Sequence, residues 1–343
     1  MENQNYKLAL WLSKHSDIKL VSNKFGKIFL PVFLPYAFLK AAFLLMTNKY
    51  DVIVLGDGVL SIVGWALKFV TGIPSICTVH GLDLTYNNGI YRKFWPGIFL
   101  RKMDKLVAVS NATVKAGIEK GIPEKKLIFI PNGVDGNDFC GDYSTKDLER
   151  IIKRSLSGKI MLLTIGRLVK RKGVAWFIGN VIQKLDNRII YVVAGDGPDK
   201  KNIKKLIADN KLESRVLLLG RVSEEEKKIL LRTCDIFIQP NIKVEGDMEG
   251  FGIAVLEAAC CGKPVIASRM EGLEDAIKDG QNGYFVETMD SAGFVSRIKE
   301  ILEGESARKG MGDRARAYVI DSYSWEKISK KYLEIAGSLA GKR

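Results

Sequence analysis

Short runs of apolar, often β-branched residues recur along the chain and alternate with segments of helical periodicity. Most runs are continuously apolar rather than alternating, which is typical of parallel strands covered by helices on both faces. The pattern therefore predicts an α/β protein with doubly wound, Rossmann-like parallel sheets. The predicted strands are DVIVLG (51–56), SICTV (75–79), KLVAVS (105–110), LIFIP (127–131), IMLLTIG (160–166), IIYVVAG (189–195), VLLLG (216–220), DIFIQP (235–240) and PVIAS (264–268).

The strand pattern pauses between Phe139 and Ser157, where the sequence is polar and charged. We interpret residues 141–157 as a linker between an N-terminal domain, 1–140, and a second domain, 158–320, facing each other across a cleft. Near the end, the pattern predicts a helix around 291–303, polar glycine-bearing sequence, and a last amphipathic helix from about Trp325. Residues 321–343 are expected to pack back on the N-terminal domain.

Two segments of the first domain raise the question of membrane contact. IFLPVFLPYAFLKAAFLLM (28–46) has nearly the length of a spanning helix and a single charge. Pro31 and Pro35 are expected to break its first half, which favours a short buried element plus a buried helix over an apolar surface against a membrane. YRKFWPGIFLRK (91–102) mixes cations with aromatic rings, and predicts either peripheral contact with an anionic membrane or a helix packed on this domain.

The charge of the chain limits the kinds of partner that we expect, and its cysteine content indicates the cellular compartment. The formal net charge is +14 and is spread over both halves, which suits anionic small molecules or lipid surfaces and gives no reason to expect nucleic acid. Five cysteines without C-x-x-C spacing indicate a reducing cytosol, and two histidines make a histidine-based metal site unexpected. No signal peptide is visible, so we expect a cytoplasmic protein, either free or peripheral on the inner face of the cytoplasmic membrane.

The stretch EGFGIAVLEAACCG (249–262) carries candidate chemistry. Glycines precede a helix that is apolar on every side except for Glu257, and a helix that follows such a loop presents free N–H groups suited to phosphate. A buried carboxylate needs donors, so Glu257 and Glu249 on either side of this loop suggest a ligand with both phosphates and hydroxyls. The alternative is that Glu257 pairs with a lysine or caps a loop, while Glu249 is solvated.

Three further motifs follow predicted strands. GRLVKRKG (166–173) places Arg167 and Lys172 just past a strand, where they can neutralise a departing diphosphate, although a solvated basic loop is the simpler alternative. AGDGP (194–198) is a tight glycine turn and a weak signal alone. In LGRVSEEE (219–226), Ser223 is predicted to cap a helix, and the backbone before it either reads a base edge or only connects two elements.

Together these motifs resemble family 4 of the retaining, Leloir-type glycosyltransferases with the GT-B fold. The resemblance rests on the two glutamates of EGFGIAVLE, on GRLVKRKG, AGDGP and LGRVSEEE, on the A-x-x-x-G-x-P-V-I-A-S ending, and on SNATV (110–114) and IPNGVD (130–135). It covers roughly residues 50 to 335. Members usually open with a strand and a glycine-rich loop, whereas NYKLALWLSKHSDIKLVSN (5–23) resembles the helix and second strand that come next.

The resemblance implies that the second domain binds the donor. Glu257 would accept hydrogen bonds from ribose hydroxyls, and Glu249 would hold hydroxyls of the transferred sugar. We expect Glu257→Ala to weaken donor binding and to leave the fold intact. The other donor-contacting residues implied are Phe251, Gly252, Ile253, Gly166, Gly195, Arg221 and Val222.

Catalytic roles are implied for four residues. Arg167 and Lys172 would stabilise the leaving nucleoside diphosphate, and His80, in HGLD after a predicted strand, would line the region of the sugar C1 together with Glu249. The first domain would then hold the acceptor.

The expected function is transfer of a hexose from a UDP- or GDP-sugar, with retention and without a metal, to a hydroxyl of a glycan or lipid-linked acceptor. A role in cell-envelope polysaccharide or glycolipid synthesis would follow. The alternatives are a sugar-nucleotide epimerase of the same fold and an inactive nucleotide-sugar-binding homologue.

Overall fold

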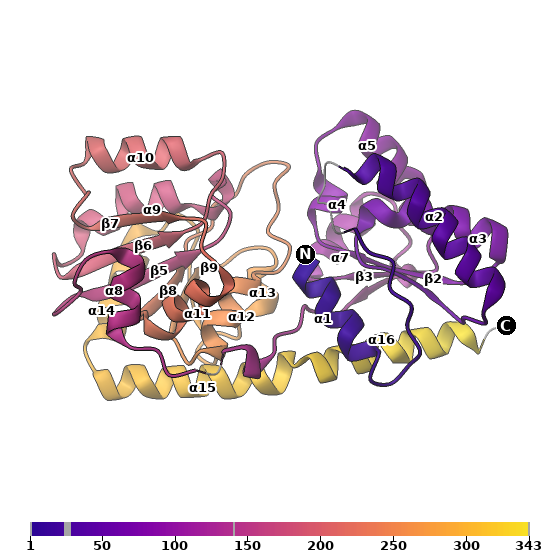
Figure 1. Ribbon diagram of the computed structural model, residues 1–343. Helices are drawn as coiled ribbons and strands as arrows, with labels where there is room; N and C mark the ends of the chain where they lie inside the picture. Colours follow the sequence, from indigo (N-terminus) through magenta and orange to yellow (C-terminus); the bar gives the residue numbers. More distant parts are fainter. Residues whose placement is uncertain (1, 24–28, 140, 342–343) are drawn as a thin grey trace. The chain divides into compact units, whose positions relative to one another are not determined.

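The computed structural model describes residues 2–23, 29–139 and 141–341. The chain forms two compact units, and each is built from segments that are not contiguous in the sequence. Unit 1 comprises Met1–Gly133, Gly246–Phe251 and Trp325–Arg343, and unit 2 comprises Val134–Glu245 and Gly252–Ser324. Both contain a parallel sheet with helices on its two faces, which confirms the predicted α/β fold class (Figure 1).

The elements of unit 1 are β1 (Ile53–Leu55), β2 (Ser75–Val79), β3 (Lys105–Ala108), β4 (Leu127–Phe129), α1 (Glu2–Leu12), α2 (Leu30–Thr47), η2 (Gly58–Leu60), α3 (Ser61–Thr71), α4 (Leu82–Thr85), α5 (Gly89–Phe94), η3 (Trp95–Phe99), α6 (Leu100–Lys102), α7 (Asn111–Glu119), η4 (Glu124–Lys126) and α16 (Trp325–Ala340). The sheet order is β1-β2-β3-β4, with every pair parallel. The four strands correspond to the first four predicted from the sequence.

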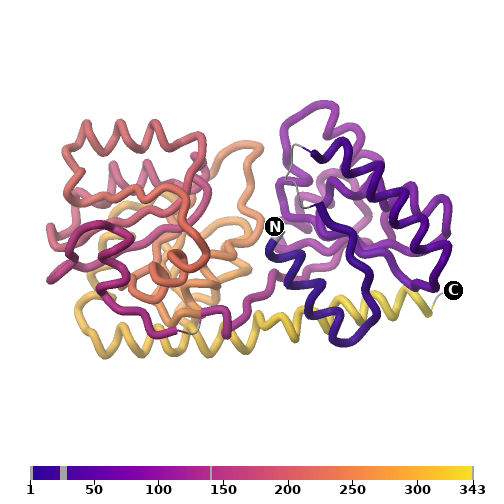
Figure 2. The backbone as a smooth tube through the Cα atoms, in the orientation of Figure 1, coloured from indigo at the N-terminus to yellow at the C-terminus, as the bar shows by residue number. Residues whose placement is uncertain are grey.

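Each face of this sheet is covered by its own apolar cluster. On one face α1 and α16, which are far apart in the sequence, lie side by side and pack on the sheet through residues such as Leu12, Ile328 and Tyr332 (Figure 2). Leu84, Leu100 and other residues from α4, α6 and α7 form the cluster on the opposite face. Both faces are therefore closed, as continuously apolar strands require.

Helix α2 departs from the sequence-based expectation. It is one continuous helix through Pro35, with Pro31 in its first turn, and Ala37 is its one buried residue. It packs on α3 rather than on the sheet. The favoured interpretation, a short buried element and a buried helix, is therefore wrong. Among the described residues, α2 is the helix long and apolar enough to cross a membrane.

The elements of unit 2 are β5 (Ile160–Ile165), β6 (Ile189–Ala194), β7 (Val216–Gly220), β8 (Ile236–Gln239), β9 (Val265–Ser268), β10 (Tyr284–Val286), η5 (Gly136–Phe139), α8 (Thr145–Ile152), η6 (Lys170–Lys172), α9 (Val174–Asn180), η7 (Ile182–Lys184), α10 (Lys200–Asp209), α11 (Glu224–Thr233), α12 (Ile253–Cys260), α13 (Leu273–Ala276), α14 (Ser291–Leu302) and α15 (Glu305–Tyr323). The order of the parallel sheet is β10-β9-β8-β5-β6-β7. Five of its six strands were predicted.

The order of strands in unit 2 reverses at its centre. From β5 the chain proceeds outward through β6 and β7, then returns to β8 on the other side of β5. Helices α9 and α10 cover one face of the sheet, and α11 and α12 cover the other (Figure 1). The loops that leave β5 and β8 therefore diverge at the carboxyl edge. That is the switch point at which open α/β sheets bind ligands.

Several boundaries differ from the expectation. Unit 2 begins at Val134, and the predicted linker 141–157 contains α8, which belongs to this unit. The polar, glycine-bearing sequence after α14, for which no element was predicted, forms the helix α15. Residues 18–23, likened to a second strand, form no strand. The last helix, α16, belongs to unit 1.

Candidate functional site

The loops at the carboxyl edge of unit 2 are tied to one another through their backbones. Gly195, after β6, lies against Gly166, after β5, so closely that a Cβ on Gly195 would collide with the Gly166 carbonyl oxygen. The Leu168 amide donates to the Asp196 carbonyl over 3.0 Å, and the Leu168 carbonyl accepts from Asp199 over 3.0 Å. The structure thus brings together Gly166 and Gly195, two of the predicted donor-binding residues, around a rigid backbone.

The basic loop after β5 is fixed in the same way. Lys172 ends the short helix η6, and the neighbouring Arg171 carbonyl accepts from the Ile242 amide over 2.8 Å, which ties this loop to the one after β8. Arg167 is exposed and Lys172 half-buried. Both predicted cations therefore lie on the loop after β5, which flanks the switch point.

Strand β7 ends at Gly220, whose carbonyl accepts from the Gly195 amide over 2.7 Å. Arg221 and Val222 follow at the same edge of the sheet. Ser223 then caps α11 in a reciprocal capping box with Glu226, which confirms the predicted helix start.

Helix α12 starts at Ile253, after Gly252 in the left-handed conformation (φ 89°) and without a side-chain cap. Its carboxylate, Glu257, has a cationic partner, because Lys227 of α11 lies 2.9 Å from Glu257 Oε1. Lys227 also lies 2.9 Å from Glu224. The lysine-pairing alternative is thus what the structure shows for Glu257.

Burial and the contact between the two side chains shift the pKa values of both Glu257 and Lys227. It raises the pKa of Glu257, and the nearby Lys227 opposes that effect. Burial also acts to lower the pKa of Lys227, but Glu257 and Glu224 outweigh it and the pKa is raised. The side chains of Lys227 and Glu257 are 14% and 15% exposed, so one edge of the pair remains open to a ligand.

Two buried polar atoms at this edge have no hydrogen-bond partner among the residues that the structure describes. They are Gln239 Oε1, at the end of β8, and Ser268 Oγ, at the end of β9. Unsatisfied buried polar atoms are uncommon and call for an explanation. Their position at the carboxyl ends of neighbouring strands fits a polar ligand at this edge. The sequence analysis did not select either residue.

The remaining predicted residues belong to unit 1. Gly250 packs on the backbone of His80, where a Cβ would clash with the His80 carbonyl. This places the loop of Glu249 and Phe251 beside His80, and both residues are buried. Glu249 is 7% exposed, which excludes the solvated alternative.

His80 has a defined hydrogen-bonding pattern. Its Nε2 lies 3.1 Å from the Gly56 carbonyl oxygen, which can only accept, so Nε2 carries the proton and Nδ1 is left as an acceptor. Burial lowers the pKa of His80, and the opposing effects of the Gly56 carbonyl and Asp57 are smaller. The imidazole is therefore neutral near neutral pH.

A pair of carboxyl groups next to His80 was missed by the sequence analysis. Asp83 is buried, and its Oδ2 accepts from the His80 amide over 2.7 Å. Burial, followed by the nearby Asp57, raises the pKa of Asp83 to about 7. These residues follow β1 and β2, which are neighbours in the sheet, so only the fold brings them together.

Asp83→Asn is expected to flatten the dependence of stability on pH. The folded chain holds the Asp83 proton more tightly than the unfolded chain between about pH 4 and 7, so the free energy of unfolding falls as pH rises through this window. The loss is about 4 kcal/mol at most. Melting temperatures at pH 5 and pH 8 measure it, with the exposed Asp51→Asn as control. An unchanged difference between the two pH values in Asp83→Asn would refute the assignment.

The predicted residues thus form two sets. Unit 1 holds His80, Glu249 and Phe251, and unit 2 holds Gly166, Arg167, Lys172, Gly195, Arg221, Val222, Gly252, Ile253 and Glu257. Among the residues that the structure describes, no group of three or more His, Cys, Asp or Glu side chains is placed to hold a metal ion.

Two α/β units, each with a parallel sheet covered by helices on both faces, form the GT-B fold, as predicted. Residues 145–331 match the glycosyl transferases group 1, and residues 13–137 match glycosyltransferase family 4. The chain belongs to the group 1 glycosyl transferases, which confirms the resemblance seen in the sequence.

Characterised and uncharacterised relatives agree with this assignment. Two uncharacterized glycosyltransferases of Methanocaldococcus jannaschii are 29% and 30% identical over 71% and 80% of this chain, which spans 61% and 72% of their lengths. A UDP-Gal:alpha-D-GlcNAc-diphosphoundecaprenol alpha-1,3-galactosyltransferase of Escherichia coli is 25% identical over 85% of this chain and 77% of its own. The structure of Anabaena HepE in complex with UDP-glucose has a TM-score of 0.77 at 20% identity, over 96% of this chain and 88% of that one.

Proposed function

We propose that the protein is a retaining glycosyltransferase that moves a hexose from a UDP- or GDP-sugar to a hydroxyl of a glycan or lipid-linked acceptor. The observation that carries the proposal is the carboxyl edge of unit 2. There, backbone-locked glycine loops, Arg167 and Lys172 flank a switch point suited to a nucleoside diphosphate. A galactosyltransferase named for a diphosphoundecaprenol-linked acceptor among the relatives supports a role in cell-envelope glycan synthesis.

In this proposal each residue has a defined role. Glu257 accepts from ribose hydroxyls, and the amides of Gly252 and Ile253 at the start of α12 contact the phosphates. Glu249 and the Phe251 amide hold the transferred sugar. The loop of Arg221 and Val222 contacts the base. The unpartnered atoms of Gln239 and Ser268 are consistent with a polar ligand at this edge.

The proposed reaction breaks the bond between the sugar C1 and the diphosphate oxygen, and forms a C1–O bond to the acceptor on the same face. The acceptor proton passes to the departing phosphate. Arg167 and Lys172 stabilise the charge on this leaving group, so we propose that no metal is needed. The neutral His80, with Nδ1 as an acceptor, lines the region of C1. We further propose that the enzyme works in the cytoplasm, at the inner face of the membrane.

Nucleoside diphosphates are expected to stabilise the protein against heat. At about 100 times the Kd, a ligand of the folded state adds about 2.7 kcal/mol to the free energy of unfolding. A thermal-shift series with UDP, GDP, ADP and their sugars identifies the base, and uridine is the control that lacks the phosphates. An equal shift with uridine, or none with any diphosphate, would contradict the donor site. Release of free nucleotide only when an acceptor alcohol is present, unaffected by EDTA, identifies transfer.

A further inference from the structure

Helix α2 has a continuous apolar stripe that faces solvent. Val32, Tyr36, Leu39, Phe43 and Met46 recur every three or four residues and are 49–77% exposed. This spacing places them on one face of a helix. Helix α2 also packs on α3. Helix α2 therefore has apolar residues on two faces: one is covered by α3, and the other is the exposed stripe.

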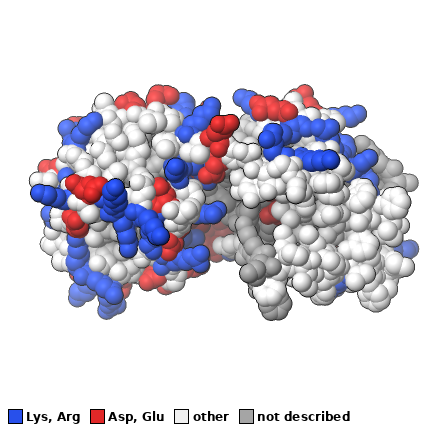
Figure 3. Space-filling model, turned by 90° about the horizontal axis from the view of Figure 1, so that it is seen from above, with Lys and Arg blue, Asp and Glu red and all other residues white. Residues whose placement is uncertain are grey.

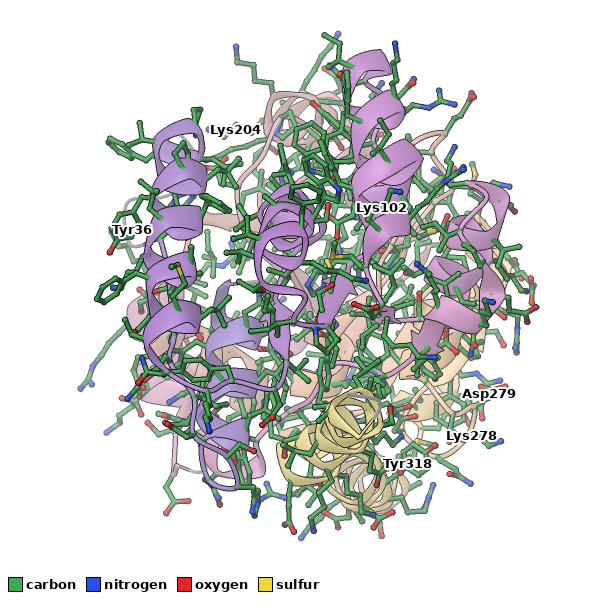
Figure 4. The ribbon with its side chains drawn as sticks, turned by 90° about the vertical axis from the view of Figure 1, so that its right-hand side faces the viewer. Tyr36, Lys102, Lys204, Lys278, Asp279 and Tyr318 are labelled. Atoms are coloured by element: carbon green, nitrogen blue, oxygen red, sulfur yellow. The ribbon has the colours of Figure 1, made fainter. Side chains whose placement is uncertain are left out.

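The stripe continues on the neighbouring helices. Trp65 and Phe69 of α3 are exposed, Phe69 by 84%, and Ile90, Phe94 and Ile98 follow at four-residue spacing along α5 and η3. Figure 4 shows these helices next to one another, with Tyr36 of α2 pointing away from the body. Seen from above in Figure 3, unit 1 presents a broad area without charged side chains, and Lys and Arg, with a few Asp or Glu, lie along one of its edges. An apolar surface of this kind marks an interaction site.

A basic pocket adjoins this apolar surface. It has a volume of about 390 Å³, and Arg92, Lys93, Arg101 and Lys120 line it together with two glycines and a proline of α5 and η3. Three of its lining residues, Gly89, Lys93 and Gly97, each come one position before an exposed apolar residue of this run. The guanidinium of Arg101 donates to the Lys120 carbonyl over 2.5 Å, which fixes one wall.

The charge of this part of the chain is one-sided. From residue 84 to residue 103 the sequence contains no Asp or Glu, and the same holds from 58 to 82. The pocket lining likewise contains no carboxylate. Four cations around a pocket are suited to a phosphate group.

We propose that this face of unit 1 binds anionic phospholipid, with a lipid phosphate in the basic pocket and the apolar stripe in the acyl region of the same leaflet. A second copy of the chain is a poorer occupant, because pairing the stripes would bring like-charged pockets together. The helix lies in the interface rather than spanning the bilayer, because α3 occupies its inner face. The inference goes beyond the proposed function. It rests on that function only where it assumes that the acceptor is carried by a membrane.

Vesicle flotation of the full chain tests the proposal. We expect binding to vesicles of equal parts phosphatidylcholine and phosphatidylglycerol, weakened by salt, and little binding to phosphatidylcholine alone. Arg92→Gln with Lys93→Gln should lower the partition coefficient about fivefold per charge. Leu39→Ser with Phe43→Ser should lower it about tenfold or more.

Matched controls separate these effects from general charge or surface changes. Lys204→Gln with Lys205→Gln removes two exposed charges from α10 in unit 2, and Leu20→Ser removes an exposed leucine elsewhere in unit 1. Both should bind vesicles as the parent does. Brominated lipid should quench the fluorescence of Trp65, and Trp65→Phe should lose that component.

Three results would overturn the proposal. The first is that the chain does not float with anionic vesicles. The second is that the Arg92 and Lys93 variant floats as much as the parent. The third is that the pocket binds inorganic phosphate while the chain does not bind vesicles. A dimer that Leu39→Ser with Phe43→Ser dissociates, without vesicle binding, would assign the stripe to a second copy instead. Calorimetry with UDP on the same variants tests the proposed function separately. The variants should bind UDP as the parent does, whether or not they bind vesicles.

Discussion

Replacing Arg167 and Lys172 together with methionine is expected to lower kcat by about a thousandfold, while the fold remains intact. Removing a single donor that stabilises developing charge typically lowers kcat by about 10²–10³-fold. Both side chains lie on the loop after β5, whose backbone is fixed by Leu168 to Asp196 and by Arg171 to Ile242. Their loss therefore removes charge from the leaving-group site without releasing the loop.

The measurement is the rate of nucleotide release at saturating donor and acceptor, together with UDP affinity by calorimetry. The control is Lys204→Met with Lys205→Met, which removes two exposed cations from the middle of α10. It should keep the parent rate. A kcat within about threefold of the parent in the Arg167 and Lys172 variant would show that these cations do not stabilise the leaving group.

Lys227→Met is expected to destabilise unit 2 by about 3–5 kcal/mol, because it leaves the carboxylate of Glu257 buried without its cation. The same argument revises the expectation for Glu257→Ala. With Lys227 2.9 Å away, that substitution lowers stability as well as donor affinity. Replacing both Lys227 and Glu257 with methionine should recover most of the loss, since no unpaired charge remains.

Urea unfolding of the two single variants and the double variant at neutral pH gives this coupling. Additive losses would show that the pair contributes no interaction energy. The ribose role of Glu257 needs a separate readout. Glu257→Gln should reduce the preference for UDP over 2′-deoxy-UDP, whereas an unchanged preference would remove Glu257 from the ribose site.

The strands could be predicted because their signal is local. Each of the nine predicted runs contains a strand, since a parallel strand covered on both faces has to be continuously apolar. The missed strand β10 is three residues long, lies at the edge of the sheet and is only partly buried, so it leaves no such run.

Helix α15 was missed and helix α2 was misjudged, because glycine and proline each occur in helices as well as at their ends. Gly312 of α15 packs against Gly262, whose carbonyl would collide with a Cβ there, so this glycine marks close packing beside α12 and not a loop. Pro31 lies in the first turn of α2, where a missing N–H costs little, and Pro35 removes one intrahelical bond. Sequence pattern alone does not distinguish these uses from helix breaks.

The candidate site was only partly predictable for a related reason. Arg167, Lys172 and the glycine loops follow strands, so their meeting at one edge could be inferred from the order of elements. The Lys227 partner of Glu257 and the pairing of Asp83 with Asp57 depend on which helices and strands become neighbours. The sequence indicated that Glu257 needs a partner, but not which of the many lysines supplies it.

The path of the chain between the units has a consequence for folding during synthesis. Unit 2 is inserted within the sequence of unit 1, whose face formed by Ile76, Val107 and Ile130 is covered by α16. On the ribosome, unit 2 can therefore complete its core first. The part of this face that α16 covers stays exposed until residues 325–340 emerge, so nascent chains halted before Trp325 are the ones that would need a chaperone.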